Sequence, residues 1–394
     1  MVSVAGAEKI ILDHLFTPWI EGVALVHSRG RILAEEIKSD RDLPPFNRAT
    51  MDGVAISFES FENGQREFLM DGLQAAGQPQ QTLPDKKKCV EIMTGAPLPI
   101  GTDSVVPYES LVIENKTAKL SGSVERNQNV HPQGSDAMQG EIVLRPGFSI
   151  SPAEVALLAS VGKPEVRVFN NPVAAVISTG DELIDVEKQP LRHQIRKSNS
   201  YALAAALDEL GCEVDVFHLA DNEMELKKKL EGILSEYALV ILSGGVSKGK
   251  FDFVPKVLES LGVKKLFHQV SQRPGKPMWF GQSEKNTVFA LPGNPVSTFM
   301  CFCRYVKPWL SKSLGFSTKA QSAILASDFI FTPGLTYFLQ VKIQNENGKL
   351  MAYPAMGGGS GDFANLKDVD GFLELPLERS EFQKGESFPL ILFR

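Results

Sequence analysis

The pattern of apolar and polar positions changes several times along the chain. Residues 5 to 40 predict helix, strand and helix, ending in the loop DLPPFNRATMDG, where consecutive prolines prevent a helix from continuing. From about residue 54, short β-branched segments such as VAISF, CVEIM, DSVVPY and LVIEN are separated by turn residues, which predicts a small β-rich domain. Residues 151 to 162 then predict a helix that begins after the N-cap Ser151 and stops at Gly162.

Strands and helices alternate from Pro172 onward. The segments VAAVIS, EVDVFHLA, ALVILS and TVFAL predict strands, and helices are predicted between them and from Pro295. Such alternation predicts a parallel sheet with right-handed crossovers and helices on both faces. The last region returns to short strands and turns (FLQVKI, LMAYP, FLELP, LILFR), which predicts a small antiparallel β domain.

These changes of pattern predict a multi-domain α/β protein with four parts. A mixed helix and strand domain takes residues 1–46 and 141–171, and a small β-rich domain, residues 47–140, is inserted into it. Residues 172–317 form the central domain, which is doubly wound and mostly parallel. Residues 318–394 form a second small β-rich domain.

Composition narrows the class of protein. The 394 residues are 43% hydrophobic and 22% charged, as in ordinary globular proteins. A net charge of −6 argues against a nucleic-acid partner, whose phosphates require a basic surface. No stretch approaches about 18 uninterrupted apolar residues, and the first residues lack the pattern of a signal peptide. We therefore expect a cytoplasmic protein that does not contact the membrane.

The four cysteines match neither a disulfide framework nor a paired metal motif. Cys301 and Cys303 could in principle chelate a metal, but two positions apart on a predicted helix they point to different faces. Buried free thiols are the favoured interpretation.

Two loops that follow predicted strands carry candidate chemistry. VAAVIS ends in TGDEL, where Asp181 and Glu182 are suited to hold Mg²⁺ or, alternatively, complete the dipole of a helix N-terminus. ALVILS runs into SGGVSKGKFD, whose glycines allow backbone N–H groups to approach a phosphate, although a tight turn is the simpler alternative. Asp252 in this loop is a candidate metal ligand or general base.

Two further loops suit an anion. RPGKP holds Arg273 and Lys276 between prolines, either as a rigid cationic grip or as a solvated surface turn. LPGNPVS follows another buried strand and places Ser297 and Thr298 near a helix N-terminus. Because the loops that follow parallel strands share one edge of the sheet, their convergence predicts a phosphate site more strongly than any one motif does.

Six motifs in this order resemble the MoeA-type molybdopterin molybdenumtransferase family, which is related to the E domain of gephyrin. They are MDG at 51–53, MTGAPLP at 93–99, STGDEL at 178–183, SGGVSKGKFD at 243–252, PGKP at 274–277 and LPGNPVS at 291–297. The resemblance implies an elongated N-terminal domain, a pterin-nucleotide site in the central domain and a homodimer. It implies Mg²⁺-dependent insertion of molybdate into adenylyl-molybdopterin with release of AMP. An upstream adenylyltransferase and acceptor molybdoenzymes are further implied partners.

The resemblance also assigns roles to residues. Asp52, Thr94 and Asp136 fall on positions of a cleft to which a second subunit contributes. Glu182, Asp221 and Asp252 fall on the acidic positions for the cation. The predicted catalytic set is Glu182, Asp252, Lys276 and Arg273. Asp221 is assigned to the metal alone. The remaining predicted substrate-binding residues are Ser243, Gly244, Gly245, Ser247, Pro292, Asn294, Pro295, Ser297 and Ser360. Caps and turns are the alternative roles for Asp52, Thr94, Asp136 and Ser360.

The chain departs from the family pattern near the expected oxyanion site. Arg273 stands where Lys is common, Gln269 and Gln340 replace cationic residues, and Val54 replaces Tyr after MDG. An Arg presents a planar fork in place of a point charge, which changes how an oxyanion is held. Two alternatives therefore stay open beside the enzyme: a divergent paralogue that handles a related oxyanion, and a pterin-binding or scaffold protein without catalytic activity.

Overall fold

The computed structural model describes residues 1–246, 253–316 and 320–394, and the chain folds as two compact units. The large unit comprises Met1–Ala34, Pro146–Ser151 and Val166–Arg394. The small unit comprises Glu35–Arg145 and Pro152–Glu165. Within the described residues, no helix is both long and apolar enough to cross a membrane.

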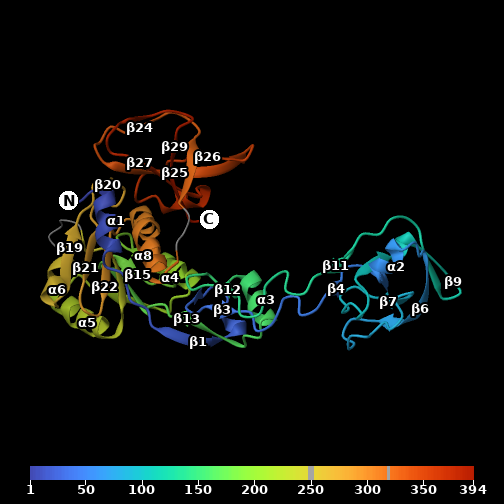
Figure 1. Ribbon diagram of the computed structural model, residues 1–394. Helices are drawn as coiled ribbons and strands as arrows, with labels where there is room; N and C mark the ends of the chain where they lie inside the picture. Colours follow the sequence, from blue (N-terminus) through green and yellow to red (C-terminus); the bar gives the residue numbers. More distant parts are fainter. Residues whose placement is uncertain (247–252, 317–319) are drawn as a thin grey trace. The chain divides into compact units, whose positions relative to one another are not determined.

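A six-stranded sheet forms the centre of the large unit (Figure 1). Its first four strands are parallel and only the fifth runs in the opposite direction, which confirms the predicted mostly parallel sheet. The reversal at the edge was not predicted, because two short apolar runs do not reveal their direction. The strands, in spatial order, are β17 (Val214–Leu219), β14 (Ala174–Thr179), β18 (Leu239–Ser243), β22 (Thr287–Leu291), β21 (Trp279–Gln282) and β19 (Lys264–His268).

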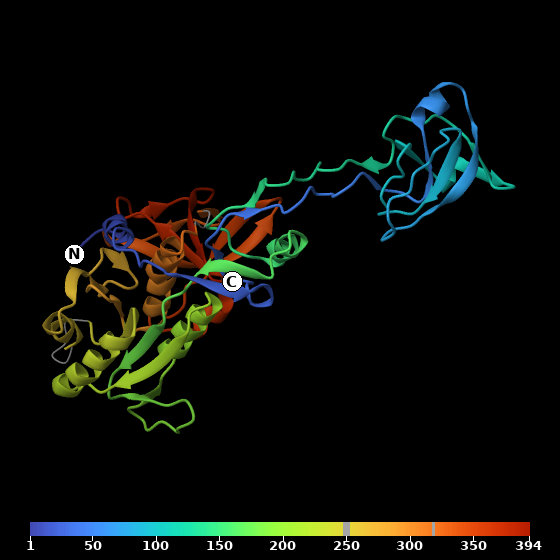
Figure 2. The same ribbon diagram turned by 60° about the horizontal axis from the view of Figure 1, so that its bottom comes forward.

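Helices cover both faces of this sheet (Figures 1 and 2). Alternate residues of β14, β18 and β22 face two separate cores, as the two-residue period of a strand requires. One core contains α5 (Glu223–Glu236) and α6 (Val254–Ser260). The other contains α1 (Val4–Leu12), α4 (Asn199–Glu209), α7 (Pro295–Cys301), the π-helical turn η3 (Phe302–Val306) and α8 (Lys307–Ser313).

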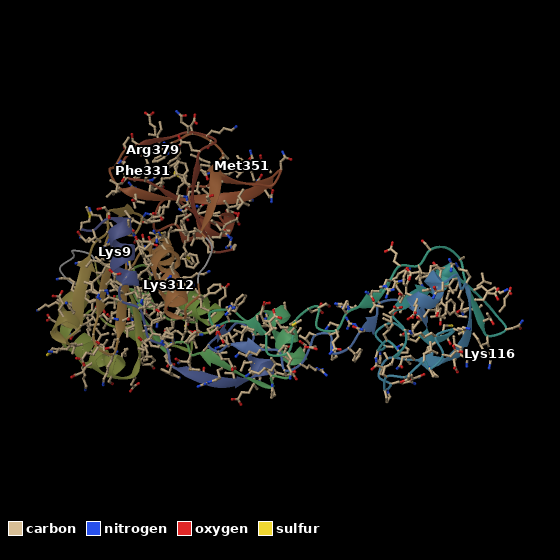
Figure 3. The ribbon with its side chains drawn as sticks, viewed as in Figure 1. Lys9, Lys116, Lys312, Phe331, Met351 and Arg379 are labelled. Carbon is tan, nitrogen blue, oxygen red and sulfur yellow. The ribbon has the colours of Figure 1, made fainter. Side chains whose placement is uncertain are left out.

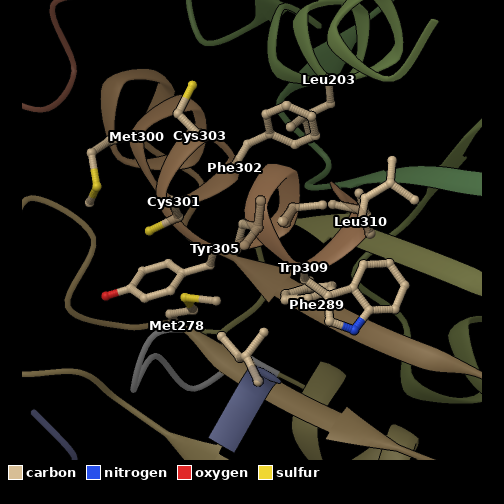
Figure 4. Close-up of a cluster of buried hydrophobic side chains, with 14 of the residues drawn as sticks. Leu203, Met278, Phe289, Met300, Cys301, Phe302, Cys303, Tyr305, Trp309 and Leu310 are labelled. Carbon is tan, nitrogen blue, oxygen red and sulfur yellow. The ribbon is translucent and has the colours of Figure 1, made fainter. Parts of the chain in front are cut away.

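The cysteines agree with the prediction of buried free thiols. Cys301 ends α7 and Cys303 lies in η3, and their sulfur atoms point in different directions (Figure 4). Burial raises the pKa of the Cys212 thiol to about 12 and that of Cys303 to about 12. Neutral thiols in these positions act as small apolar side chains.

The C-terminal strands close into a small barrel, because each of five strands pairs with two others of the set. Phe331 stacks on Tyr337 with ring centroids 4.2 Å apart. The side chains of this C-terminal part, among them Phe331, Met351 and Arg379, are drawn in Figure 3. The antiparallel prediction was wrong for one pair, β23 with β26, which is parallel. The barrel strands are β23 (Gln321–Leu325), β25 (Thr336–Glu346), β26 (Lys349–Pro354), β27 (Gly371–Leu375) and β29 (Ser387–Leu392). Smaller elements beside it are β24 (Phe329–Ile330), β28 (Glu381–Phe382) and η4 (Phe363–Asp368).

The second helix predicted between residues 5 and 40 is absent. That stretch forms a 3₁₀ turn, η1 (Leu25–His27), followed by β2 (Ile32–Leu33) and β3 (Ile37–Lys38). The segment pairs with distant strands, and such tertiary pairing overrides local helix propensity. β1 (Ile20–Ala24), β13 (Glu165–Phe169) and β2 form one sheet, and β3 pairs with β12 (Ile142–Leu144).

The small unit contains the predicted β-rich region and the helix α3 (Pro152–Ser160). Val54, Ile56 and Phe68 are fully buried in its core. The helix α2 (Phe58–Glu62) was not predicted, nor were two strands of the six-stranded sheet, at Glu67–Gln74 and Thr117–Leu120. The six-stranded sheet has the order β8 (Ser104–Pro107), β5 (Gly53–Ile56), β7 (Lys88–Ile92), β6 (Glu67–Gln74), β10 (Thr117–Leu120) and β9 (Leu111–Glu114). A separate pair is formed by β4 (Arg48–Ala49) and β11 (Val130–His131). The division of the whole chain into four domains stays a prediction.

Candidate functional site

A cavity of about 1080 Å³ lies in the large unit where β14, β18 and β22 end. Its lining includes residues from the four loops singled out from the sequence: Thr179, Gly180 and Glu182 from the first loop, and residues 243–246, 273–277 and 292–297 from the others. Segments of the C-terminal part of the chain, at 335–340 and 356–361, complete it. The arrangement follows the rule that open α/β sheets bind ligands at the carboxyl ends of their strands.

Two of the predicted acidic ligands, Glu182 and Asp221, line the cavity. Asp181 does not, and its carboxylate accepts a hydrogen bond from the Asp221 backbone N–H at 3.1 Å, so it fastens the loop after β17. Glu182 folds back over Gly180, at which a Cβ would lie 2.6 Å from the carboxylate. The described ranges contain no group of three or more residues able to hold a metal ion. The third predicted ligand, Asp252, lies outside them, as does Ser247.

The loop after β18 needs glycine at two positions. Gly244 and Gly245 have φ values of +102° and +68°, and a Cβ at Gly244 would lie 2.7 Å from the Thr179 hydroxyl. The N–H of Gly244 donates to the Leu291 carbonyl at 3.1 Å, so this amide joins two strand ends and is engaged within the protein. The Ser243 hydroxyl is also engaged, because it donates to the Pro292 carbonyl at 3.4 Å.

The cationic loop, RPGKP at 273–277, has two exposed charged side chains and is anchored by the buried residue that precedes it. Arg273 and Lys276 are exposed and line the cavity. Gln272 is fully buried: its amide donates to the Gly275 carbonyl (3.1 Å) and to Cys301 Sγ (3.4 Å), and it accepts a hydrogen bond from the Tyr305 hydroxyl. Burial raises the pKa of Tyr305, so the hydroxyl stays a donor. The loop belongs to β20 (Gln272–Arg273), which pairs with β25.

Ser360 lies against the loop after β22. The Asn294 side-chain amide donates to the Ser360 hydroxyl at 2.9 Å, and the Val296 N–H donates to the Ser360 carbonyl at 3.2 Å. The first turn of α7 therefore already holds an internal acceptor. Pro292, Pro295 and Ser297 line the same cavity.

The two glutamines that depart from the family pattern are placed differently. Gln340 is buried and lines the cavity, and its carbonyl accepts a hydrogen bond from the Asn365 amide at 3.1 Å. Gln269 is not part of the lining, and its backbone pairs with Met278 and Val2. Only Gln340 of the two changes the chemistry of the cavity wall.

Several lining residues were not found from the sequence, among them Arg196, Lys197 and Asn199. Lys197 forms an ion pair with Asp185 and, together with Lys188, lowers the pKa of Asp185 to about 2. The sequence feature that could have revealed these residues is the segment IRKSN, which places two cations directly before a helix. Its meaning depends on β15 (Leu183–Ile184) and β16 (Ile195–Arg196), whose pairing brings the segment beside the loop after β14.

Asp52, Thr94 and Asp136 belong to the small unit and are not part of the cavity lining. The carboxylate of Asp52 accepts hydrogen bonds from the Thr94 N–H (2.6 Å) and hydroxyl (2.8 Å), which lower the pKa of Asp52. Asp136 lies 2.8 Å from His131 Nε2, and Arg48 lies 3.0 Å from His131 Nδ1. The contact between Asp52 and Thr94 joins two loops 42 positions apart, and any further role of these two residues rests on the resemblance.

Known families match almost the whole chain. Residues 2–162 match the MoeA N-terminal region (domain I and II), residues 175–312 a probable molybdopterin binding domain, and residues 322–393 the MoeA C-terminal region (domain IV). A Synechocystis protein named molybdopterin molybdenumtransferase is 40% identical over 99% of both chains. A Haemophilus influenzae protein of the same name is 34% identical over 98% of this chain and 97% of its own.

A solved structure agrees with these matches. The molybdopterin biosynthesis MoeA protein of Pyrococcus horikoshii OT3 is 30% identical, covers all of both chains and superposes with a TM-score of 0.86. The similarity therefore extends through the fold of the whole chain.

Proposed function

The chain belongs to the MoeA family of molybdopterin molybdenumtransferases, enzymes of molybdenum cofactor biosynthesis, and we propose that it inserts molybdate into adenylyl-molybdopterin with Mg²⁺-dependent release of AMP. One observation supports this reaction above others: a single cavity has Glu182 and Asp221 in its lining together with Arg273 and Lys276. A ligand that carries phosphates and a divalent cation needs both kinds of charge.

The proposed roles follow from charge. Glu182 and Asp221, with Asp252, supply the carboxylate oxygens that Mg²⁺ prefers. A Mg²⁺ ion held by these carboxylates would neutralise the phosphates and would polarise the linkage whose cleavage releases AMP. Arg273 and Lys276 stabilise negative charge that develops on the phosphate oxygens. The fixed loop behind them supports this role, because Gln272 holds Gly275 between the two cations.

The loops around the cavity serve as the substrate site in this proposal. Ser243, Gly244, Gly245 and Ser247 hold the nucleotide part on one side, and Pro292, Asn294, Pro295, Ser297 and Ser360 hold it on the other. The supporting contact is the hydrogen bond from Asn294 to Ser360, which closes the wall between them.

We further propose a cytoplasmic homodimer in which the partner subunit supplies the small-unit residues Asp52, Thr94 and Asp136. The match of MDG and MTGAPLP to the family motifs supports the assignment of Asp52 and Thr94. An upstream adenylyltransferase supplies the substrate, and molybdoenzymes accept the product.

The first test is AMP release from adenylyl-molybdopterin by purified protein with Mg²⁺, with and without molybdate, followed by a metal assay of the pterin product. AMP release that depends on molybdate, with molybdenum in the product, is the expected result. Tight binding of the substrate without turnover would support the scaffold alternative. Tungstate preferred over molybdate would support the divergent paralogue, whose motivation is Gln340 in the cavity wall.

Asp252→Asn and Glu182→Gln test the acidic residues. Each keeps the shape of the side chain and removes the charge required for metal or base work, so a loss of about 10²-fold or more in kcat is expected with folding intact. Glu187→Gln is the matched control, because Glu187 is exposed and not in the cavity lining. Unchanged turnover in Asp252→Asn would remove Asp252 from the mechanism.

A further inference from the structure

Asn199, the first residue of α4, connects the two loops that follow the neighbouring strands β18 and β22. Its side-chain amide donates to Ser243 Oγ at 2.8 Å, where β18 ends. The same nitrogen lies 2.7 Å from the Gly293 carbonyl, in the loop after β22, and 3.2 Å from Thr298 Oγ1 on α7. One amide group thus contacts three chain segments that border the cavity.

The acceptors are themselves linked. The Thr298 hydroxyl donates to the Pro292 carbonyl at 2.5 Å and lies 3.1 Å from the Asn294 carbonyl, and the Ser243 hydroxyl reaches the same Pro292 carbonyl. Thr298 and Ser243 are both almost fully buried. The β ladder and the Gly244 N–H already join the ends of β18 and β22, and this side-chain network adds a second link between the loops that follow them.

The orientation of the amide is determined by its partners. All three acceptors lie on the nitrogen side, and a backbone carbonyl such as that of Gly293 accepts but cannot donate. The Asn199 Oδ1 atom is buried and has no hydrogen-bond partner. Leaving a buried acceptor without a partner is unfavourable, so the N–H contacts of Asn199 form at some expense in stability.

We propose that Asn199 is a positioning residue for the anion-binding part of the cavity. Its amide holds Ser243–Gly245 and Pro292–Pro295 at the separation that the phosphate groups of the substrate require. The inference rests on the proposed function for the identity of the ligand. The geometry of the network does not depend on the proposed function, because all of its atoms belong to the protein.

Other side chains cannot replace the amide. Aspartate has the same shape but directs oxygen at the Gly293 carbonyl and adds a negative charge beside a phosphate site. Serine and threonine have one donor, too few to hold Ser243 and Gly293 together. Asn199→Asp is therefore the informative substitution, because it removes the donors with the least change in volume.

The test compares two Asn→Asp substitutions in the large unit. Asn286 precedes β22, at the opposite end of that strand, and its amide also donates to two backbone carbonyls, those of buried Leu234 and half-buried Tyr237, both at 2.7 Å. Asn199→Asp is expected to raise the KM for adenylyl-molybdopterin about tenfold while kcat changes less than about threefold. Asn286→Asp is expected to lower the urea midpoint and to leave KM unchanged. An equal rise of KM in both variants, or none in Asn199→Asp, would overturn the proposal.

A second readout needs no substrate. The Gly244 N–H donates to Leu291 and the Thr298 N–H donates to Asn294, so both amides report on the loops. In Asn199→Asp they should exchange hydrogen faster than in wild type, and in Asn286→Asp they should not. If wild-type protein shows no turnover, the proposed function fails, and this exchange experiment alone decides whether Asn199 holds the loops. Unchanged exchange would refute it.

Thr298→Val covers the case in which Asn199→Asp does not fold. It removes the acceptor on α7 and leaves the other two contacts of Asn199. A smaller rise of KM, again with little change in kcat, is then expected. A Thr298→Val protein with wild-type KM and wild-type exchange at Gly244 would contradict the network.

Discussion

Gly275→Ala tests how tightly the cationic loop is held. Gly275 has a φ of +87°, and a Cβ there would lie 2.6 Å from Cys301 Sγ, 2.8 Å from Gln272 Nε2 and 3.0 Å from Met300 Cε. Two costs are therefore expected: about 1–2 kcal/mol for a left-handed conformation with a Cβ, and about 1–3 kcal/mol for overpacking a filled site. Their sum predicts a loss of about 2–5 kcal/mol in the free energy of unfolding.

Gly262→Ala separates the two costs. Gly262 has almost the same φ, +86°, and a Cβ there would meet nothing within 4 Å. This variant should lose only the conformational part, about 1–2 kcal/mol. Urea denaturation of both variants and wild type at one temperature measures the difference, which is the packing cost alone.

The packing argument has two further consequences. Cys301→Ala removes the nearest atom, so Gly275→Ala should cost less in that background than in wild type. Because Gly275 lies between Arg273 and Lys276, the substitution should also weaken substrate binding. If Gly275→Ala is no more destabilising than Gly262→Ala, the loop is not packed as the structure shows and the reasoning fails.

Two other changes test charged contacts in the large unit. The Arg304 side chain is 12% exposed and forms ion pairs with Glu8 (2.8 Å) and Glu374 (2.7 Å). Arg304→Met should therefore lower the free energy of unfolding by about 2–4 kcal/mol, toward the smaller value because Glu8 is partly exposed. Urea denaturation measures this loss, and a loss no greater than that of Glu374→Gln would contradict the prediction. Lys197→Met should move the pKa of Asp185 from about 2 toward its ordinary value of 3.8, as NMR titration would show. Because the folded-state pKa of Asp185 is depressed, the ion pair stabilises the wild type fully above pH 3.8 and loses this effect as the pH falls toward 2. The variant should lack that part of the acid dependence of stability. An unmoved pKa would mean that Lys197 does not control Asp185.

Much of the central domain could be predicted from short-range patterns. β14, β18 and β22 are almost fully buried, and each was visible as an apolar run that ends in glycine, proline or acidic residues. The loops that follow them were recognised because glycine and proline restrict the backbone in ways that a sequence displays directly. The same reasoning failed between residues 25 and 40, where pairing with distant strands decided the conformation.

The site was predictable only in part. Glu182 was found because it follows an apolar strand, and Arg273 and Lys276 because prolines flank them, whereas Asp221 was found only through the family resemblance. Gln272 and Asn199 were missed, since an amide in isolation carries no sign of its partners. Gln272 acts through Tyr305 and Asn199 through Gly293, which are 33 and 94 positions away.

The sequence by itself determined the class of the fold, the order of its motifs and the membership of the family, because these depend on local patterns and their succession. The tertiary structure alone decided which polar groups face the cavity and which form hydrogen bonds within the protein. Asp181 and the Gly244 amide are engaged internally, and Ser360 is brought to Asn294 across 66 positions. The physical reason is that hydrogen bonds act over about 3 Å in space and are indifferent to separation along the chain.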